Sequence, residues 1–246
     1  MERKMVAQMH GILTIDKQVG MSSHGVVAHL RRLLGTRHIG HAGTLDPLAT
    51  GLLVVLVGDA TRSCASAMAG EKRYDATVRF GFSTTTDDRE GSPLDWGHAP
   101  AVDLSALLPV LEKFLGEQVQ IPPRFCAKKI GGVPCYRSGR SGRTVSIAGR
   151  PVQIFQIFNL LWNAPLLKFS LACSPGTYVR SLARDIGSAV GCPAHLHRLR
   201  RTHSGCFFVG LARTLPELAK LNGMAMVDEM AKNWQLLDQA QALLSH

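Results

Sequence analysis

The sequence predicts an α+β fold in which helices flank a mixed, largely antiparallel sheet. Segments with strand character and segments with helical period alternate irregularly, and several strands follow one another closely along the chain. The nucleotide-binding motifs G-x-G-x-x-G and G-x-x-x-x-G-K-[ST] are absent, which argues against a doubly wound parallel sheet. The 246 residues suffice for one large domain, or for one domain with a small appendage.

The N-terminal elements follow from apolar period and capping residues. Apolar side chains at Val26, Val27, Leu30, Leu33 and Leu34 repeat with the helical period, a serine precedes them and a glycine follows them. The elements expected in this half are a strand at 11–16, a helix from 22 or 23 to 35, a loop at 40–51, a buried strand at 52–57 and a helix at 61–69.

The remaining elements rest on similar patterns. Tyr74, Ala76, Val78 and Phe80 alternate with polar residues and predict a half-buried strand. Pro109 fits a helix only if that helix begins near residue 105, which would put the proline in its first turn. The expected elements are a strand at 74–80, a loop at 83–93, a helix at 104–115, an irregular basic segment at 120–150, strands at 152–161 and 166–173, a helix at 177–190 and a mainly helical tail from 215.

The charge of the chain favours a polyanionic partner. Twenty-eight basic and 18 acidic residues give a net charge of +10. Nucleic acid is the first interpretation and an anionic membrane surface the second, while a merely solubilising charge is the alternative. The longest apolar run has about seven residues, against the roughly 20 that a membrane helix needs. The first residues lack the pattern of a signal peptide, so we expect a cytoplasmic location.

The six cysteines are expected to be free thiols, because nothing in the sequence indicates secretion. One cluster resembles zinc-ligand spacing, but it lacks a C-x2-C knuckle and is interrupted by leucines and arginines. Buried thiols and surface histidines are therefore the preferred interpretation, and no metal site is predicted. The cluster consists of Cys192, His195, His197, His203 and Cys206.

The segment from Gly40 to Gly51 is the strongest candidate for chemistry. It places one carboxylate, Asp46, on a glycine-rich loop at the start of a buried strand, where binding and catalytic groups concentrate. The structural alternative is an aspartate that caps a turn before Pro47.

Two further groups of residues can serve the same chemistry. Tyr74 follows Lys72 and Arg73, and Tyr178 and Arg180 stand at a strand-turn-helix corner. An arginine beside a carboxylate keeps it ionised, and a tyrosine ring can stack on a base. The alternatives are an ordinary strand aromatic for Tyr74 and a solvated helix residue for Arg180. The basic segment at 120–150 is expected to be functional, with a solvated surface loop as its alternative.

From residue 11 to residue 213 the chain resembles the TruB family of tRNA pseudouridine synthases, of the bacterial type. The block G-x-L-D-P-x-A-T-G is highly specific, and seven blocks occur in the family's order. The matching blocks are Asp16-Lys17 with Gly20, Met21 and Ser22; 40–51; 72–74; 86–88 with Gly91; 120–123; 176–180; and 194–195 with 199–202.

The resemblance implies the pseudouridine synthase fold and a set of catalytic roles. Asp46 corresponds to the essential catalytic aspartate. Tyr74 would stack on the flipped uracil and help the proton leave C5. Arg180 would pair with Asp46, and Tyr178 would shape the pocket beside it.

The resemblance also implies substrate-binding roles. Leu199 would pack against the base, and Lys17 would support the wall of the pocket. His41 would fill the space left when the T loop opens, Thr44 of the same loop would contact the substrate, and Asp88 would bond a flipped nucleotide. Lys128 and Arg140 belong to a basic segment, about 124–150, that would close over RNA.

The implied reaction converts a uridine in the T arm of tRNA to pseudouridine. The base is flipped, the C1′–N1 bond breaks, and C5 joins C1′. This isomerisation needs no cofactor. Asp46 could attack a carbon covalently or act as a base on the sugar, and the sequence leaves both open.

The implied partner is the T stem-loop of tRNA, bound by a monomer without a protein partner or a membrane. Residues 1–213 would form the catalytic domain. Residues 214–246 would form a short helical extension, too short for a full RNA-binding domain of the PUA type, so we expect weak, salt-dependent binding. The alternatives are the synthase subunit of a guide-RNA particle, a non-catalytic RNA-binding protein on this fold, and a zinc-dependent nucleic-acid binder.

Overall fold

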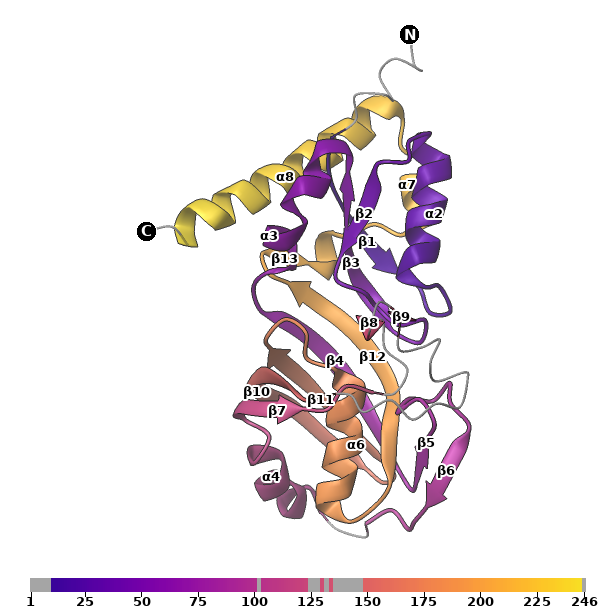
Figure 1. The fold of residues 1–246 in the computed structure, drawn as a ribbon, viewed down its shortest axis with the longest axis vertical. Coiled ribbons are helices and arrows are strands. Elements are labelled where there is room, and N and C mark those ends of the chain that lie inside the picture. Colours follow the sequence, from indigo (N-terminus) through magenta and orange to yellow (C-terminus); the bar gives the residue numbers. More distant parts are fainter. Residues whose placement is uncertain (1–9, 101–102, 124–128, 131–132, 135–147, 245–246) are drawn as a thin grey trace. The chain divides into compact units, whose positions relative to one another are not determined.

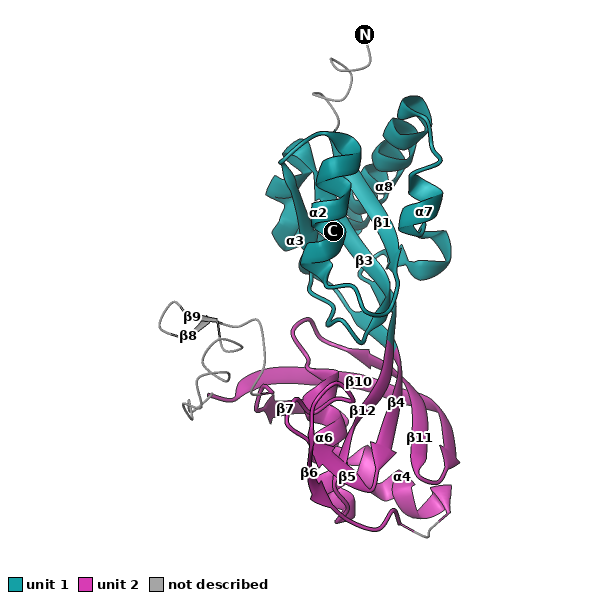
Figure 2. Cartoon of the chain, turned by 90° about the vertical axis from the view of Figure 1, so that its right-hand side faces the viewer, with its two compact units in different colours: residues 1–74, 200–246 teal, residues 75–199 magenta. Residues whose placement is uncertain are grey.

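The chain folds into two compact units, one of which is built from both ends of the sequence. The computed structural model describes residues 10–100, 103–123, 129–130, 133–134 and 148–244. Unit 1 comprises residues 1–74 and 200–246, and unit 2 comprises residues 75–199 (Figure 2). The chain passes from one unit to the other inside β4 (Lys72–Phe80), after Tyr74, and inside β12 (Ala194–Ser204), after Leu199.

Unit 1 is organised around β3 (Figure 1). This strand pairs antiparallel with β1 and β2, and parallel with β12 at residues 50 and 51. Every residue of β3 after Thr50 is buried, so both of its faces are covered. The other elements of the unit are β1 (Gly11–Lys17), α2 (Ser23–Leu34), β2 (Ile39–Ala42), β3 (Thr50–Val57), η1 (Gly58–Ser63), α3 (Cys64–Met68), β13 (Phe207–Phe208), η2 (Val209–Leu211), α7 (Leu215–Leu218) and α8 (Gly223–Leu244).

The free edge of β1 is covered by the C-terminal part of the chain. Arg213 donates from its backbone nitrogen to the Thr14 carbonyl, 3.0 Å away, and accepts from the Asp16 nitrogen at 2.9 Å. Asn233 of α8 donates to the Ile12 carbonyl at 3.2 Å. Three backbone groups on this edge of the strand are therefore satisfied within the chain.

Unit 2 is built on an antiparallel arrangement in which β10 pairs with both β7 and β11, and β4 lies next to β11 (Figure 1). Helices α4 and α6 pack against each other. The elements are β5 (Phe82–Thr84), β6 (Pro93–Trp96), α4 (Leu104–Glu112), β7 (Gly116–Gln120), β8 (Lys129–Ile130), β9 (Val133–Pro134), β10 (Arg150–Asn163), β11 (Leu166–Cys173) and α6 (Val179–Val190).

The predicted fold class is confirmed: the structure is α+β, with a mixed and mostly antiparallel sheet. Helix α2 is confirmed to its ends, because Ser22 caps its N-terminus and Gly35 closes it with a φ of +63°.

Several boundaries differ from the prediction. The segment 61–69 begins as a 3-10 helix, and 83–93 contains the ends of the β5–β6 hairpin. Pro109 lies inside α4 and beyond its first turn, so the Ser105 carbonyl loses its helical partner. The helix ends at Glu112 rather than at Leu115. The 11-residue strand β12 was not predicted.

Among the helices that the structure describes, none combines the length and the apolarity needed to cross a bilayer.

Candidate active site

The loop that carries Asp46 is fixed to helix α2 through one hydroxyl group. Ser23, the first residue of α2, is buried, and its Oγ donates to the Leu45 carbonyl at 2.9 Å. The same Oγ accepts from the Leu45 backbone nitrogen at 2.7 Å. Both backbone polar groups of the residue before Asp46 are thus held by a single side chain.

A buried ammonium group holds the other side of the loop. The Lys17 side chain is 1% exposed, and its Nζ lies 2.7 Å from the Met21 carbonyl and 3.5 Å from the Pro47 carbonyl. The Pro47 carbonyl also accepts from the Gly20 nitrogen at 2.8 Å. Lys17 therefore supports the backbone directly after Asp46, and its predicted role in the pocket wall stays a prediction.

Arg201 fixes the start of the loop, and sequence reasoning did not single it out. Its buried guanidinium donates from Nε to the Leu52 carbonyl at 2.7 Å and from Nη2 to the Gly43 carbonyl at 3.2 Å. The β12 backbone approaches β3 so closely that a Cβ on Gly51 would lie 2.3 Å from the Arg201 carbonyl oxygen. Only glycine fits there, and its φ of +93° agrees.

The side chains of the loop differ in exposure. Asp46 is half-buried and Thr44 is exposed, while the Asp46 carbonyl closes a turn by accepting from Ala49. His41, at the end of β2, is half-buried, and its Nδ1 has no hydrogen-bond partner among the described residues. Burial, and then the charges of Arg201 and His24, lower the pKa of His41.

Tyr74 lies in β4 and is 8% exposed, as the alternating pattern predicts. Two residues earlier, the buried Lys72 ammonium donates to Ser204 Oγ at 2.9 Å and to the Ala69 carbonyl at 3.2 Å. The start of β4 is therefore fixed by a lysine whose charge is directed inward.

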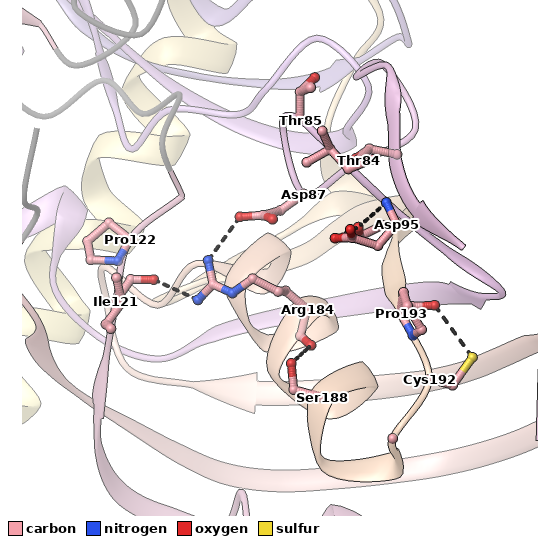
Figure 3. A pocket seen from close by; sticks show the side chains of 14 residues that line it. Thr84, Thr85, Asp87, Asp95, Ile121, Pro122, Arg184, Ser188, Cys192 and Pro193 are labelled. Atoms are coloured by element: carbon pink, nitrogen blue, oxygen red, sulfur yellow. Dashed lines mark hydrogen bonds and ion pairs between the residues drawn. The ribbon is translucent and has the colours of Figure 1, made fainter. Parts of the chain in front are cut away.

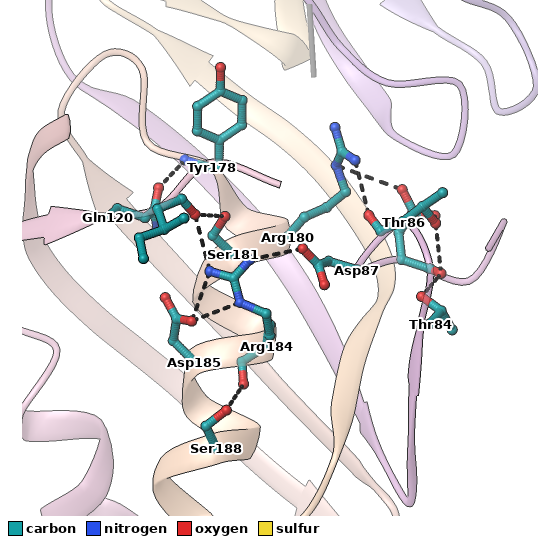
Figure 4. A network of polar contacts seen from close by, with 12 residues as sticks. Thr84, Thr86, Asp87, Gln120, Tyr178, Arg180, Ser181, Arg184, Asp185 and Ser188 are labelled. Atoms are coloured by element: carbon teal, nitrogen blue, oxygen red, sulfur yellow. Dashed lines mark hydrogen bonds and ion pairs between the residues drawn. The ribbon is translucent and has the colours of Figure 1, made fainter. Parts of the chain in front are cut away.

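In unit 2, Arg180 belongs to a buried polar network (Figure 4). Its Nη1 donates to the Thr86 carbonyl at 3.0 Å, and its Nε lies 3.7 Å from Asp88 Oδ2. Asp88 is 4% exposed, and its Oδ1 accepts from Thr86 Oγ1 at 2.6 Å and from the Glu90 nitrogen at 3.0 Å. Asp88 thus holds Arg180, and its predicted contact with a nucleotide stays a prediction.

The neighbouring Asp87 serves a second arginine. It adopts a left-handed φ of +59°, and its Oδ2 accepts from Arg184 Nη1 at 3.0 Å. Arg184 also donates to Asp185 and to the Ile121 carbonyl. Burial raises the pKa of Asp87, and the Arg184 charge opposes this effect. The block at 86–88 therefore fixes the first two turns of α6.

Tyr178 precedes α6 at its N-cap position. Its backbone nitrogen donates to Gln120 Oε1 at 2.7 Å, and its ring points away from the polar network (Figure 4). The Arg150 guanidinium lies 5.7 Å from the centre of this ring. A Cβ on Gly176 would lie 2.1 Å from the Arg150 guanidinium, so the glycine admits the arginine.

A pocket of about 730 Å³ lies beside this network in unit 2 (Figure 3). The Arg184 side chain crosses it toward Asp87 and Ile121, and Asp95 and Cys192 line its opposite side. None of the predicted site residues that the structure describes lines it. Arg184, the arginine of this pocket, already donates to acceptors of the protein itself. We therefore assign the pocket no role in the chemistry.

The predicted site residues divide between the units. Asp46, Tyr74, Lys17, His41 and Thr44 belong to unit 1, and Arg180, Tyr178, Asp88 and the buried Leu199 belong to unit 2. Within unit 2 the structure brings Arg180 and Asp88 together. The predicted pair of Asp46 and Arg180 stays a prediction, and Lys128 and Arg140 lie outside the described residues.

The cysteines and histidines have separate surroundings. In the part of the chain that the structure describes, no group of His, Cys, Asp or Glu side chains is arranged to hold a metal ion. His195 Nδ1 lies 2.9 Å from the Phe82 carbonyl, and His203 stacks on Phe208. The four described cysteines are free thiols, which confirms the expectation for them.

Family models cover most of the chain. Residues 31–179 match the N-terminal domain of TruB family pseudouridylate synthases, and residues 180–240 match the C-terminal domain of tRNA pseudouridylate synthase B.

Individual relatives agree with these models. The tRNA pseudouridine synthase B of Geotalea uraniireducens is 42% identical over 86% of this chain and 68% of its own length. That of Thermobifida fusca is 45% identical over 85% of this chain and 74% of its own. That of Burkholderia lata is 41% identical over 96% and 71%, respectively.

Solved structures share the fold. A chain of a Cbf5-Nop10-Gar1 complex superposes with a TM-score of 0.69 and 26% identity over 96% of this chain. A chain of an H/ACA RNP bound to a substrate RNA containing 2′-deoxyuridine gives a TM-score of 0.68 at the same identity. This chain spans only 61% and 62% of those two chains. The predicted family and enzyme class are confirmed: the chain belongs to the TruB family of pseudouridylate synthases.

Proposed function

We propose that this protein is a tRNA pseudouridine synthase that isomerises a uridine of the T arm. The observation that supports this proposal is the family match, together with the loop of Asp46. Three side chains hold the backbone of that loop in place. The relatives named as tRNA enzymes are 41–45% identical, whereas the chains from guide-RNA assemblies are 26% identical. This difference favours tRNA as the substrate. We further infer a monomer that acts in the cytoplasm without a protein partner.

In the proposed reaction Asp46 acts on the ribose of a flipped uridine. The C1′–N1 bond breaks, the uracil turns, C5 bonds to C1′, and the proton on C5 is lost while N1 gains one. Asp46 either forms a bond to a carbon of the sugar or removes a sugar proton. In both cases its carboxylate must be ionised and precisely placed, which agrees with a loop fixed on both sides of it.

The other residues support this step. Tyr74 stacks on the uracil and Leu199 packs against it. Arg180 balances the charge of Asp46, and Tyr178 shapes the pocket. The arrangement in unit 2 adds a positioning role for Asp88, because its carboxylate faces the Arg180 guanidinium.

Further residues contact the RNA or frame the pocket. Lys17 supports the loop, and His41 and Thr44 meet the opened T loop. Residues 1–213 carry the catalytic activity, with the segment at about 124–150, including Lys128 and Arg140, closing over the RNA. Residues 214–246 extend this domain.

The test is release of tritium from C5-labelled uridine in a T-arm stem-loop transcript. We expect the natural protein to release the label, and Asp46→Asn to release none while still binding the RNA. Asparagine keeps the size of the side chain but can neither attack a carbon nor accept a proton. Equal release by both proteins would remove Asp46 from the mechanism, and no release by the natural protein would refute the proposed activity.

A further inference from the structure

A row of aromatic rings with cations beside it lies on unit 2, outside the predicted catalytic residues. The Trp96 and Phe82 ring centres are 4.9 Å apart, Phe82 and His195 are 4.5 Å apart, and His195 and His197 are 6.3 Å apart. The Arg79 guanidinium lies 5.5 Å from the centre of the Phe82 ring. We call Trp96, Phe82, His195 and His197, with Arg79 and Arg89, the ring strip.

Strand pairing explains why these residues meet. His195 and His197 are two apart in β12, so they share one face of the strand. On one side of β12 lies β4, which carries Arg79. On the other side Asp88 bridges to Leu196, and the Arg89 nitrogen donates to the Leu196 carbonyl at 3.0 Å. Cations therefore flank the histidines from both neighbouring segments.

The described carboxylates do not form ion pairs with the arginines of the strip. None of the ion pairs among the described residues involves Arg79, Arg89 or the adjacent Arg198. The buried atoms Arg79 Nε and His197 Nδ1 have no hydrogen-bond partner among the described residues. Burial, and then Arg89, lower the pKa of His197, as expected where cations crowd together. Burial lowers the pKa of His195, and the one carboxylate that opposes this effect, Asp88, already faces Arg180.

Exposure of the outer members suits a large partner. The Trp96 side chain is 72% exposed, although a tryptophan gains free energy by burying its ring. Arg89 is also exposed. A flat ring beside unbalanced cations is the combination with which proteins hold single-stranded nucleic acid, since bases stack on the ring and phosphates pair with the cations.

We propose that the ring strip binds RNA, with Arg79 and Arg89 against phosphates and Trp96 stacked on an unpaired base. This inference rests on the proposed function in one respect, namely that RNA is the polyanion. It goes further by assigning a contact surface to residues that carry none of the chemistry. An acidic protein segment would be the competing occupant, but it offers no bases to stack on an exposed tryptophan.

The experiment measures binding of a tRNA transcript to the full chain at several salt concentrations. Arg89→Ala should weaken binding and reduce the slope of log Kd against log salt by about one phosphate contact. Trp96→Ala should weaken binding on the order of tenfold with an unchanged slope, because stacking is not ionic. Arg62→Ala, which removes an exposed charge from unit 1, should change the slope less than Arg89→Ala.

Two results would overturn the proposal. One is wild-type affinity for tRNA in both Arg89→Ala and Trp96→Ala, which is also what an acidic protein partner predicts. The other is a change in the salt slope for Arg62→Ala as large as that for Arg89→Ala, which would mean that only the overall positive charge of the protein matters. Because binding is measured directly, a protein that binds through the strip but releases no tritium would refute the proposed activity alone.

Discussion

Replacing Ser23 by alanine should release the loop that carries Asp46. The Ser23 hydroxyl makes two buried hydrogen bonds to the backbone of Leu45, at 2.9 and 2.7 Å. Each hydrogen bond contributes about 1 kcal/mol. Its loss leaves a buried backbone group of Leu45 without a partner, which costs roughly 1–3 kcal/mol. We therefore expect a loss of about 2–4 kcal/mol in the free energy of unfolding, depending on how far the loop relaxes.

Ser22→Ala provides the matched control. Ser22 Oγ accepts from the Gly25 nitrogen at 3.0 Å and caps the same helix, whereas the hydrogen bonds to Leu45 come from Ser23. Its loss should cost about 1 kcal/mol, the usual value for an N-cap serine. Urea unfolding monitored by circular dichroism measures both variants.

Tritium release separates the position of the loop from general stability. Ser23→Ala should lower kcat at least tenfold, about 1.4 kcal/mol in the barrier, because Asp46 is displaced. Ser22→Ala should keep kcat, and Ser23→Thr, which restores the hydroxyl, should recover part of it. Equal losses of stability and of kcat in Ser22→Ala and Ser23→Ala would refute the reasoning.

Two further predictions follow from single positions. Gly51→Ala should destabilise unit 1 by about 2 kcal/mol or more in urea unfolding, because its Cβ would lie 2.3 Å from a backbone oxygen. Gly40→Ala, with open space around its Cβ, should change the stability by no more than about 0.5 kcal/mol. Equal unfolding midpoints for the two variants would contradict this. Burial, followed by Arg79, lowers the folded-state pKa of His195 from 6.5, against the opposing effects of the Phe82 carbonyl and Asp88. The unfolded chain then binds more protons below pH 6.5, so stability should fall as pH falls from 7 toward 5, and His195→Gln should flatten this dependence in pH-dependent thermal unfolding; an unchanged slope would sink the idea.

Local signals made part of the fold predictable. Helix α2 begins after a capping serine and ends at a left-handed glycine, and both are properties of a few adjacent residues. Strand β12 was missed because arginine and histidine occupy most of its second half. Arg201 is 2% exposed there, and a sequence pattern assigns arginines to the surface.

The residues of the candidate site could be predicted from the sequence, but the side chains that hold them in place could not. Asp46 stands out because it is a carboxylate among glycines. Ser23, which holds the loop, lies 22 residues from Leu45, and Arg201 lies 158 residues from Gly43. Such contacts depend on tertiary structure and leave no periodic trace in one sequence. The ion pair of Arg180 with Asp88 also depends on tertiary structure, and the family resemblance did not suggest it.

The division of unit 1 between the two ends of the sequence has a consequence for biosynthesis. Unit 2 is one continuous stretch, complete once residue 199 has left the ribosome, whereas β1 obtains its backbone partners at Arg213 and Asn233 only after those later residues have been synthesised. We therefore expect the middle of the chain to acquire protease resistance first in stalled nascent chains. The earliest strand to be synthesised is then among the last to be secured.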